Sequence, residues 1–330
     1  MEKYVPPFEI NNDMLNLVSS IMEKIGRLSN YAYLDKMPIL RRNNRIKSIH
    51  SSLAIEANSL SLGQVKDIIN GKLVLGPQKE VQEVQNAYKA YEEIGNYNPY
   101  SLDDLKKAHG YLTYLTVDSS GEFRKGEEGV FDGDKCIFMA PPAERVPELM
   151  NGLFEWMNEN KDTIHPLILS SIFHYEFVFI HPFNDGNGRC ARLWQTVILS
   201  KYKEFFEYLP IESQIFKYQD EYYEAINECN KSGNSNKFIL FMLKMIDEVL
   251  NEVLNVSQDM IINSNIYIKK LLDVMEYDVP MSANEIMEKL GIKSKETLRG
   301  NYLEPAIKEG LVKLTIPDKP TSKNQMYYKV

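Results

Sequence analysis

One twelve-residue segment brings together side chains that suit phosphate chemistry. It spans residues 181–192 and reads HPFNDGNGRCAR. The imidazole of His181 can act as a general base, and Asp185 can bind a divalent cation against a phosphate. Arg189 and Arg192 are spaced by one helical turn, so their guanidinium groups can face the same anion. These residue types predict a site for a phosphorylated ligand.

Two apolar runs flank this segment and must position it. Residues 172–180 precede it and residues 193–199 follow it, and we expect both runs to form buried helices. Residues 184–188 are Asn, Asp and Gly, which favour a turn and end the first helix. A polar loop before a helix N-terminus presents free backbone N–H groups, which makes an anion site. The plainer alternative is a structural corner with a buried histidine, but a corner needs neither the arginines nor the carboxylate.

The segment resembles the Fic-domain signature H-x-F-x-(D/E)-G-N-G-R-x-x-R and matches every fixed position. The resemblance implies an α-helical domain that transfers AMP from ATP, with Mg²⁺, onto a Ser, Thr or Tyr hydroxyl of a target protein. It implies that His181 deprotonates this hydroxyl and that Asp185 binds the metal ion. It also implies that the nucleotide phosphates lie on the loop and the first turn of the next helix, at Gly186, Asn187, Gly188, Arg189, Cys190, Ala191 and Arg192.

A stretch nearer the N-terminus resembles the inhibitory motif of Fic proteins, (S/T)-x-x-x-E-(G/N). Ser52 and Glu56 match it, but Ala57 stands where glycine or asparagine is usual, and Asn58 comes one place late. The resemblance implies that Glu56 pairs with Arg192. Such a pair would inhibit the reaction, because an arginine committed to a carboxylate cannot also clamp a phosphate bidentately. The alternative is a surface glutamate at a helix end.

Two further regions resemble parts of Fic domains. Residues 121–124 (Gly-Glu-Phe-Arg) precede residues 129–139, which read as two short strands around an Asp-Gly turn. They resemble the Fic flap, whose open edge can pair with a target protein, although a surface hairpin without a partner is the alternative. Tyr223 lies in a predicted helix and is the candidate for the adenine pocket, because a flat base stacks on an aromatic ring. Plain core packing is its alternative.

Two other histidines are expected to be packed core residues. His109 lies in an apolar helical pattern, and we assign it no role. His174 precedes His181 by seven residues, which departs from the His-Glu-x-x-His spacing of zinc hydrolases and argues against that class.

The length of 330 residues predicts two or three structural units. Residues 1–100 are expected to form an N-terminal helical region with the inhibitory helix at about 38–58. Residues 101–256 are expected to form the Fic catalytic core.

The C-terminal region, residues 260–330, resembles a winged helix-turn-helix domain. It reads as a short helix ending at Gly291, a second helix over 295–309, and strands over 311–316 and 325–330. The last fifty residues carry nine Lys or Arg against six Asp or Glu. DNA and protein are therefore both open as partners of this domain.

The composition sets the remaining expectations. A net charge of −8 argues against the whole chain binding nucleic acid or a membrane surface. Three widely spaced cysteines suggest a reducing compartment. The N-terminus has no apolar core of signal-peptide type, and no run is long enough to cross a membrane. We expect a cytoplasmic adenylyltransferase with room for a homodimer. Two alternatives stay open: a nucleotide-sensing DNA-binding regulator, and a de-AMPylase that uses the same residues.

Overall fold

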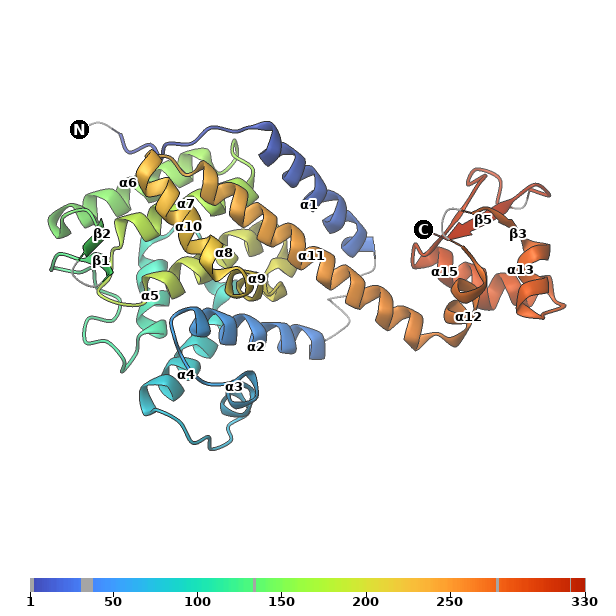
Figure 1. The fold of residues 1–330 in the computed structure, drawn as a ribbon, viewed down its shortest axis with the longest axis horizontal. Helices are drawn as coiled ribbons and strands as arrows, with labels where there is room; N and C mark the ends of the chain where they lie inside the picture. Colours follow the sequence, from blue (N-terminus) through green and yellow to red (C-terminus); the bar gives the residue numbers. More distant parts are fainter. Residues whose placement is uncertain (1–2, 31–37, 133–134, 277–278, 321, 330) are drawn as a thin grey trace. The chain divides into compact units, whose positions relative to one another are not determined.

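The computed structural model describes residues 3–30, 38–132, 135–276, 279–320 and 322–329. These residues form a mainly helical protein, which confirms the predicted fold class (Figure 1). Contacts along the chain group Met1–Glu23 with Leu34–Leu250, and Lys24–Tyr33 with Asn251–Val330. We call these groups the first and second unit and describe each by itself. The predicted boundaries at residues 100 and 256 stay predictions.

The first unit is built almost entirely from helices. Two helices, α1 (Asn12–Asn30) and α11 (Asn236–Ser264), have residues in both units. The others are α2 (Pro38–Ile55), α3 (Leu62–Ile69), α4 (Gln78–Glu92), α5 (Leu102–Leu112), α6 (Val146–Asn160), α7 (Pro166–Ile180), α8 (Asn187–Tyr202), α9 (Ile211–Lys217) and α10 (Gln219–Ser232). Short 3₁₀ turns lie at η1 (Ile94–Asn96), η2 (Ala143–Arg145) and η3 (Glu204–Tyr208).

Helices α7 and α8 form the buried centre of this unit. Helix α7 is apolar on nearly all sides, so it must be covered on every side, and it packs against α6 and α8. Pro166 begins it, where a missing N–H costs nothing, and the ring of His165 accepts the Leu167 N–H. Helix α8 also packs against α5 and α2. The two helices predicted to flank the polar loop are therefore present and buried.

Helix α2 packs between α4 and α9 and stops in a Schellman motif. The N–H of Ala57 donates to the carbonyl of Ala54, and the N–H of Asn58 donates to the carbonyl of Leu53. Ala57 has φ of 64°, the left-handed conformation that this motif needs. The glutamate before it, Glu56, is therefore held at a fixed place beyond the last helical turn.

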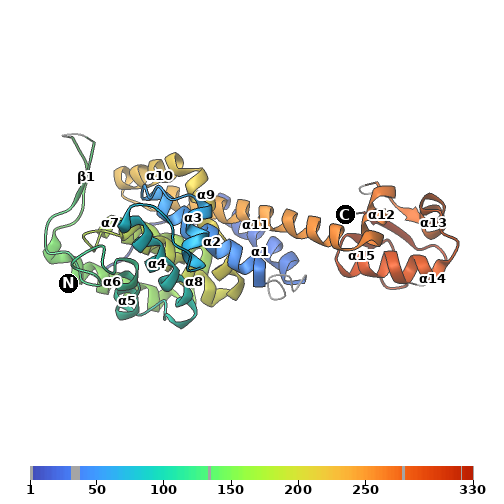
Figure 2. The same ribbon diagram turned by 90° about the horizontal axis from the view of Figure 1, so that it is seen from below.

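A hairpin follows the Gly-Glu-Phe-Arg segment, as predicted (Figure 2). Strand β1 (Gly129–Asp132) pairs antiparallel with β2 (Lys135–Met139), and the register shifts between Val130 and Phe131. Gly133 and Asp134 of the predicted turn lie outside the described residues. In Figure 2 the hairpin stands out from the helices of the first unit.

The second unit contains a small antiparallel sheet with the strand order β3-β5-β4. Its core is formed by residues such as Leu271, Ile286, Leu298 and Ala306. Its elements are α12 (Ile266–Val274), β3 (Met281–Ser282), α13 (Ala283–Leu290), α14 (Lys295–Thr297), a π-helical turn η4 (Leu298–Leu303), α15 (Glu304–Lys308), β4 (Val312–Leu314) and β5 (Met326–Lys329).

Most elements predicted for this unit are present, with one correction. Helix α13 ends at Gly291, whose φ is 68°, and both predicted strands form. The single helix expected over 295–309 is instead three helical segments. Pro305 explains part of this break, because its ring removes one backbone donor and crowds the preceding turn. The likeness to a winged helix-turn-helix domain stays a prediction.

Candidate active site

The polar loop is closed by its own hydrogen bonds. His181 caps the C-terminus of α7 with φ of 50°, and Gly186 caps the N-terminus of α8 with φ of 82°. The side chain of Asn187 accepts the Phe183 N–H at 3.0 Å and donates to the Phe183 carbonyl at 2.7 Å. A Cβ at Gly186 would lie 2.9 Å from Thr113 Cγ2 in addition to the strained φ. The loop therefore needs glycine at this position.

His181 lies at the edge of the cavity beside this loop. Burial lowers its pKa below the ordinary histidine value, and a hydrogen bond with the Val178 carbonyl opposes that shift. The imidazole is therefore neutral near pH 7 and can accept a proton.

Arg124, which carried no predicted role, fixes the backbone of His181. Its Nε donates to the His181 carbonyl at 2.7 Å, and its backbone N–H donates to the Pro182 carbonyl at 2.9 Å. Further bonds reach the carbonyls of Gly126 and Pro141 on either side of the hairpin. Arg124 thus joins the loop to the base of the hairpin. The available signal was its place in the Gly-x-Phe-Arg segment.

His109 is a packed residue, as predicted, and it also holds the loop. It is 1% exposed and stacks on Phe183 with ring centroids 3.6 Å apart. Its Nδ1 accepts the Gly121 N–H at 3.0 Å, so Nε2 carries the proton and donates to the Asp185 carbonyl at 2.9 Å. Burial lowers the pKa of His109 to about 4, so the ring stays neutral. The loop is therefore attached to α5.

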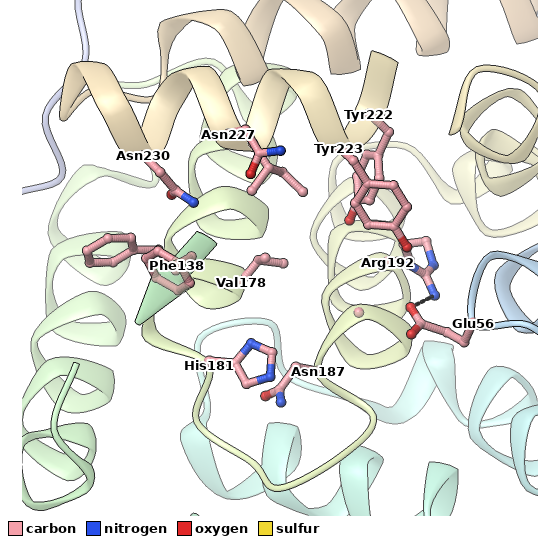
Figure 3. A pocket seen from close by; sticks show the side chains of 13 residues that line it. Glu56, Phe138, Val178, His181, Asn187, Arg192, Tyr222, Tyr223, Asn227 and Asn230 are labelled. Atoms are coloured by element: carbon pink, nitrogen blue, oxygen red, sulfur yellow. Dashed lines mark hydrogen bonds and ion pairs between the residues drawn. The ribbon is translucent and has the colours of Figure 1, made fainter. Parts of the chain in front are cut away.

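The structure brings Glu56 and Arg192 together. Arg192 Nη2 donates to Glu56 Oε1 at 2.8 Å and to the Ser52 carbonyl at 2.9 Å, while Nε donates to Ser52 Oγ at 3.0 Å. Figure 3 shows the pair at one end of the cavity. A Cβ added to Gly188 would lie 2.2 Å from Glu56 Oε1, so the carboxylate lies directly against this glycine.

The other motif arginine, Arg189, is engaged differently. Its Nη2 donates to Asp185 Oδ1 at 2.9 Å, and its Nη1 donates to Glu83 Oε1 of α4 at 3.2 Å. Arg189 is buried, and it does not line the cavity. Two predicted nucleotide positions, Cys190 and Ala191, are also fully buried and away from the cavity. The N–H of Cys190 is already bonded to the Gly186 carbonyl.

The cavity has a volume of about 360 Å³ (Figure 3). His181, Asn187, Gly188, Arg192 and Glu56 line one part of it. The other walls of the cavity include Phe138, Val178, Tyr222, Tyr223, Asn227 and Asn230. Of these residues, only Tyr223 was a predicted site residue. A signal for the two asparagines was present, because positions 223, 227 and 230 share one face of a helix.

His174 is the packed residue that was predicted, and it fixes Tyr222. It is completely buried; its Nδ1 donates to Gln195 Oε1 at 2.5 Å and its Nε2 accepts from the Tyr222 hydroxyl at 3.0 Å. Burial lowers the pKa of His174 to about 3, so it stays a neutral acceptor. Tyr223 reaches the end of α2 instead, where its hydroxyl donates to the Ile55 carbonyl at 3.5 Å.

The described residues lack both a preformed metal cluster and a membrane-spanning helix. Those residues contain no cluster of three or more His, Cys, Asp or Glu side chains that could hold a metal ion by themselves. No described helix is both long and apolar enough to cross a membrane.

Curated relatives share part of the chain. A protein adenylyltransferase Fic from Nematostella vectensis is 25% identical over 260 residues, which is 74% of this chain and 57% of the relative. Protein adenylyltransferase fic-1 from Caenorhabditis elegans is 27% identical over 275 residues, which is 77% of this chain and 50% of the relative. The chain thus spans about half the length of these relatives.

Two family models and a solved structure match both the central and the C-terminal parts of the chain. Residues 99–199 match the Fic/DOC family, and residues 267–328 match the C-terminal domain of Fic-like proteins (filamentation induced by cAMP). The crystal structure of a Fic family protein from Desulfovibrio desulfuricans G20 is 40% identical with a TM-score of 0.74, covering 99% of this chain and 98% of that one. With the loop, the arginines and the histidine in place, this likeness over the full length shows that the chain belongs to the Fic family.

Proposed function

We propose that the chain transfers AMP from ATP to a hydroxyl group of a target protein, and that Glu56 restrains this transfer. The observation that carries the proposal is one cavity in which a neutral histidine, a glycine-containing helix N-terminus and Arg192 meet. The names of the curated relatives support the same reaction class.

The cavity offers separate surroundings for the base and the phosphates of ATP. The rings of Tyr222 and Tyr223, with Asn227 and Asn230, provide a flat apolar wall and amide groups, which suit a purine. Gly188 and Arg192 lie at the other end, where the N-terminus of α8 favours anions. The adenine ring of ATP therefore binds beside α10, and the phosphates bind at the loop.

His181 acts as the general base in this proposal. Its ring accepts the proton of the target hydroxyl as the hydroxyl oxygen forms a bond to the α-phosphorus of ATP. The bond between that phosphorus and the bridging oxygen of the β-phosphate breaks, and pyrophosphate leaves. The product is a phosphodiester that joins AMP to the target side chain. The loop and arginines stabilise the charge that develops on the phosphate oxygens.

Asp185 fits the Mg²⁺ that the family implies. Mg²⁺ is commonly held by only one or two carboxylates together with substrate phosphates, so a single carboxylate on the loop is a sufficient protein ligand. The side chain of Asp185 is 43% exposed, and Oδ1 is the oxygen that accepts from both Arg189 and the Gly186 N–H. When bound, the ion would supply positive charge against the phosphates.

Glu56 restrains the reaction because it holds Arg192 and lies on Gly188, where the outer phosphates would come. We propose that a target protein pairs with the open edge of the β1–β2 hairpin, near His181. The partner of the C-terminal region 260–330, DNA or protein, and a homodimer are further proposals.

The proposed function is tested by incubating the full-length protein with labelled ATP and measuring intact mass. We expect Glu56→Gly to increase self-labelling or target labelling, with a mass gain of one AMP. Adding His181→Ala in that background should reduce the rate by about 10² or more, because it removes the base. His165→Ala, which changes a histidine outside the cavity, is the matched control.

Two results would contradict this function. Equal labelling by the His181→Ala variant removes the histidine from the reaction. Loss of AMP from an already modified target, without any gain by an unmodified one, identifies the reverse reaction instead.

A further inference from the structure

We propose that Glu83 is a second restraint on the nucleotide site, which occupies Arg189 in the way that Glu56 occupies Arg192. This inference rests on the proposed function, because it assumes that both arginines bind the phosphates. Glu83 belongs to α4, outside the Fic signature and outside the inhibitory motif.

The ion pair between Glu83 and Arg189 is well shielded from water. Arg189 Nη1 and Glu83 Oε1 are 3.2 Å apart, and the two side chains are 5% and 13% exposed. Shielded charges interact more strongly than exposed ones, because solvent screens them less. The second terminal nitrogen, Nη2, is bonded to Asp185 at 2.9 Å. Both terminal nitrogens of Arg189 are thus engaged by carboxylates.

A phosphate that binds Arg189 must compete with these carboxylates. A guanidinium group clamps an oxyanion through two parallel N–H donors, so a phosphate that approaches the side of Arg189 held by Glu83 must displace that carboxylate. Arg189 Nε is buried and has no hydrogen-bond partner among the described residues, so it cannot be reached without movement. Asp185 would hold the metal ion in the proposed function, so Glu83 is the competitor that has no other role there.

Glu83 also connects Arg189 to the end of the inhibitory helix. Its second oxygen, Oε2, accepts a hydrogen bond from Asn58 Nδ2 at 2.9 Å. Asn58 follows Glu56 by two residues, so one short segment after α2 contains the partner of Arg192 and contacts the partner of Arg189. Asn58, which is one place late for the inhibitory motif, thus has a separate task. It orients the carboxylate that holds Arg189.

The test compares ATP affinities of full-length variants by calorimetry in the presence of Mg²⁺. Glu83→Gln is introduced into the Glu56→Gly background, in which Arg192 is already released. We expect ATP to bind roughly fivefold more tightly than to Glu56→Gly alone, the lower end of a typical coupling between sites. Inorganic triphosphate is the second probe, because its binding needs the arginines but neither the base nor catalysis.

Glu80→Gln in the same background is the matched control. Glu80 lies one turn earlier on α4 and bonds the N–H and hydroxyl of Ser59 at 2.7 and 2.8 Å. Its side chain therefore holds the same segment through Ser59, as Glu83 does through Asn58, but it is not the carboxylate that engages Arg189. We expect this variant to leave the affinity for both probes unchanged.

Unchanged or weaker binding of both probes by Glu83→Gln overturns the inference, as does an equal gain in Glu80→Gln. If Glu83→Gln lowers the unfolding midpoint, Glu83→Asp is measured instead, and its shorter reach should move affinity in the same direction. Tighter binding without any AMP transfer would leave this restraint standing and contradict the proposed function. The two failures are therefore distinguishable.

Discussion

Arg192 shows how a few buried hydrogen bonds can decide whether a phosphate site is available. Its Nε and Nη2 atoms donate to Ser52 and Glu56, and the residue is 2% exposed. A buried guanidinium needs partners, and the α2 segment supplies them to Nε and Nη2. Phosphate oxygens can supply the same partners, which makes the two arrangements alternatives.

Ser52→Ala is expected to weaken the restraint partially. It removes the hydroxyl that accepts from Arg192 Nε but keeps the Ser52 carbonyl and the Glu56 ion pair. The loss of one hydrogen bond is worth about 1 kcal/mol, so labelling should rise roughly fivefold, to a level below that of Glu56→Gly. Rates of AMP incorporation measure this. Ser51→Ala, whose hydroxyl contacts Ser213, is the control and should leave the rate unchanged.

The residues of the site differ in how far the sequence could predict them. His181, Arg192 and Glu56 follow from two motifs, and the structure brings them together. Glu83 could not be predicted, because it lies 106 positions before Arg189 and no motif links them. The Gly-x-Phe-Arg segment marked Arg124, but its contacts could not be predicted, because they go to backbone carbonyls of distant residues.

At the scale of elements, the end of α2 sets the position of the inhibitory glutamate. Ala57 occupies the left-handed position of the Schellman motif, where the family motif has glycine or asparagine. A left-handed conformation costs a residue with a Cβ roughly 1–2 kcal/mol, and glycine avoids that cost. Alanine at this position therefore keeps the hydrogen bonds of the Schellman motif, but its backbone is strained.

Ala57→Gly is expected to strengthen the restraint. Relief of the strain, less the greater backbone entropy of glycine when unfolded, should favour the docked end of α2 by about 1 kcal/mol. Labelling by the parent protein should then fall roughly fivefold.

The control for this substitution lies three residues earlier. Ala54→Gly places glycine inside the helix, where it costs about 1 kcal/mol, and should raise labelling instead. Initial rates with labelled ATP measure both variants, and a rise in Ala57→Gly as well would contradict the strain assigned to Ala57.

At the scale of the whole molecule, folding depends on keeping several histidines neutral. Burial lowers the pKa of His109 to about 4 and that of His174 to about 3, and it also lowers the pKa of His181. Glu176 accepts a hydrogen bond from the Tyr4 hydroxyl, and burial raises its pKa to about 7. Its titration therefore changes the stability with pH in the direction opposite to that of the histidines. The sequence predicted that two of these histidines are packed, but not their hydrogen bonds, because the partners come from distant elements.

The contribution of His109 can be isolated from these opposing effects by comparing two proteins across pH. The ordinary pKa of histidine is 6.5, so below that pH the unfolded chain takes up a proton that the folded chain, with a pKa of about 4, excludes. This stability is fully present above pH 6.5 and is lost as pH falls toward 4. Between pH 7 and 5 the loss is about 2 kcal/mol.

His109→Gln removes this titration and keeps the geometry. The amide oxygen can accept the Gly121 N–H, and the amide nitrogen can donate to the Asp185 carbonyl, as the two ring nitrogens do. The unfolding midpoint of the parent protein should therefore fall by roughly 4 °C more than that of the variant between pH 7 and pH 5. Thermal unfolding followed by circular dichroism at both pH values measures this difference, in which the titration of Glu176 and His174 cancels. Equal shifts in the two proteins would show that His109 is protonated in the folded state, and the loop could then not depend on its neutral ring.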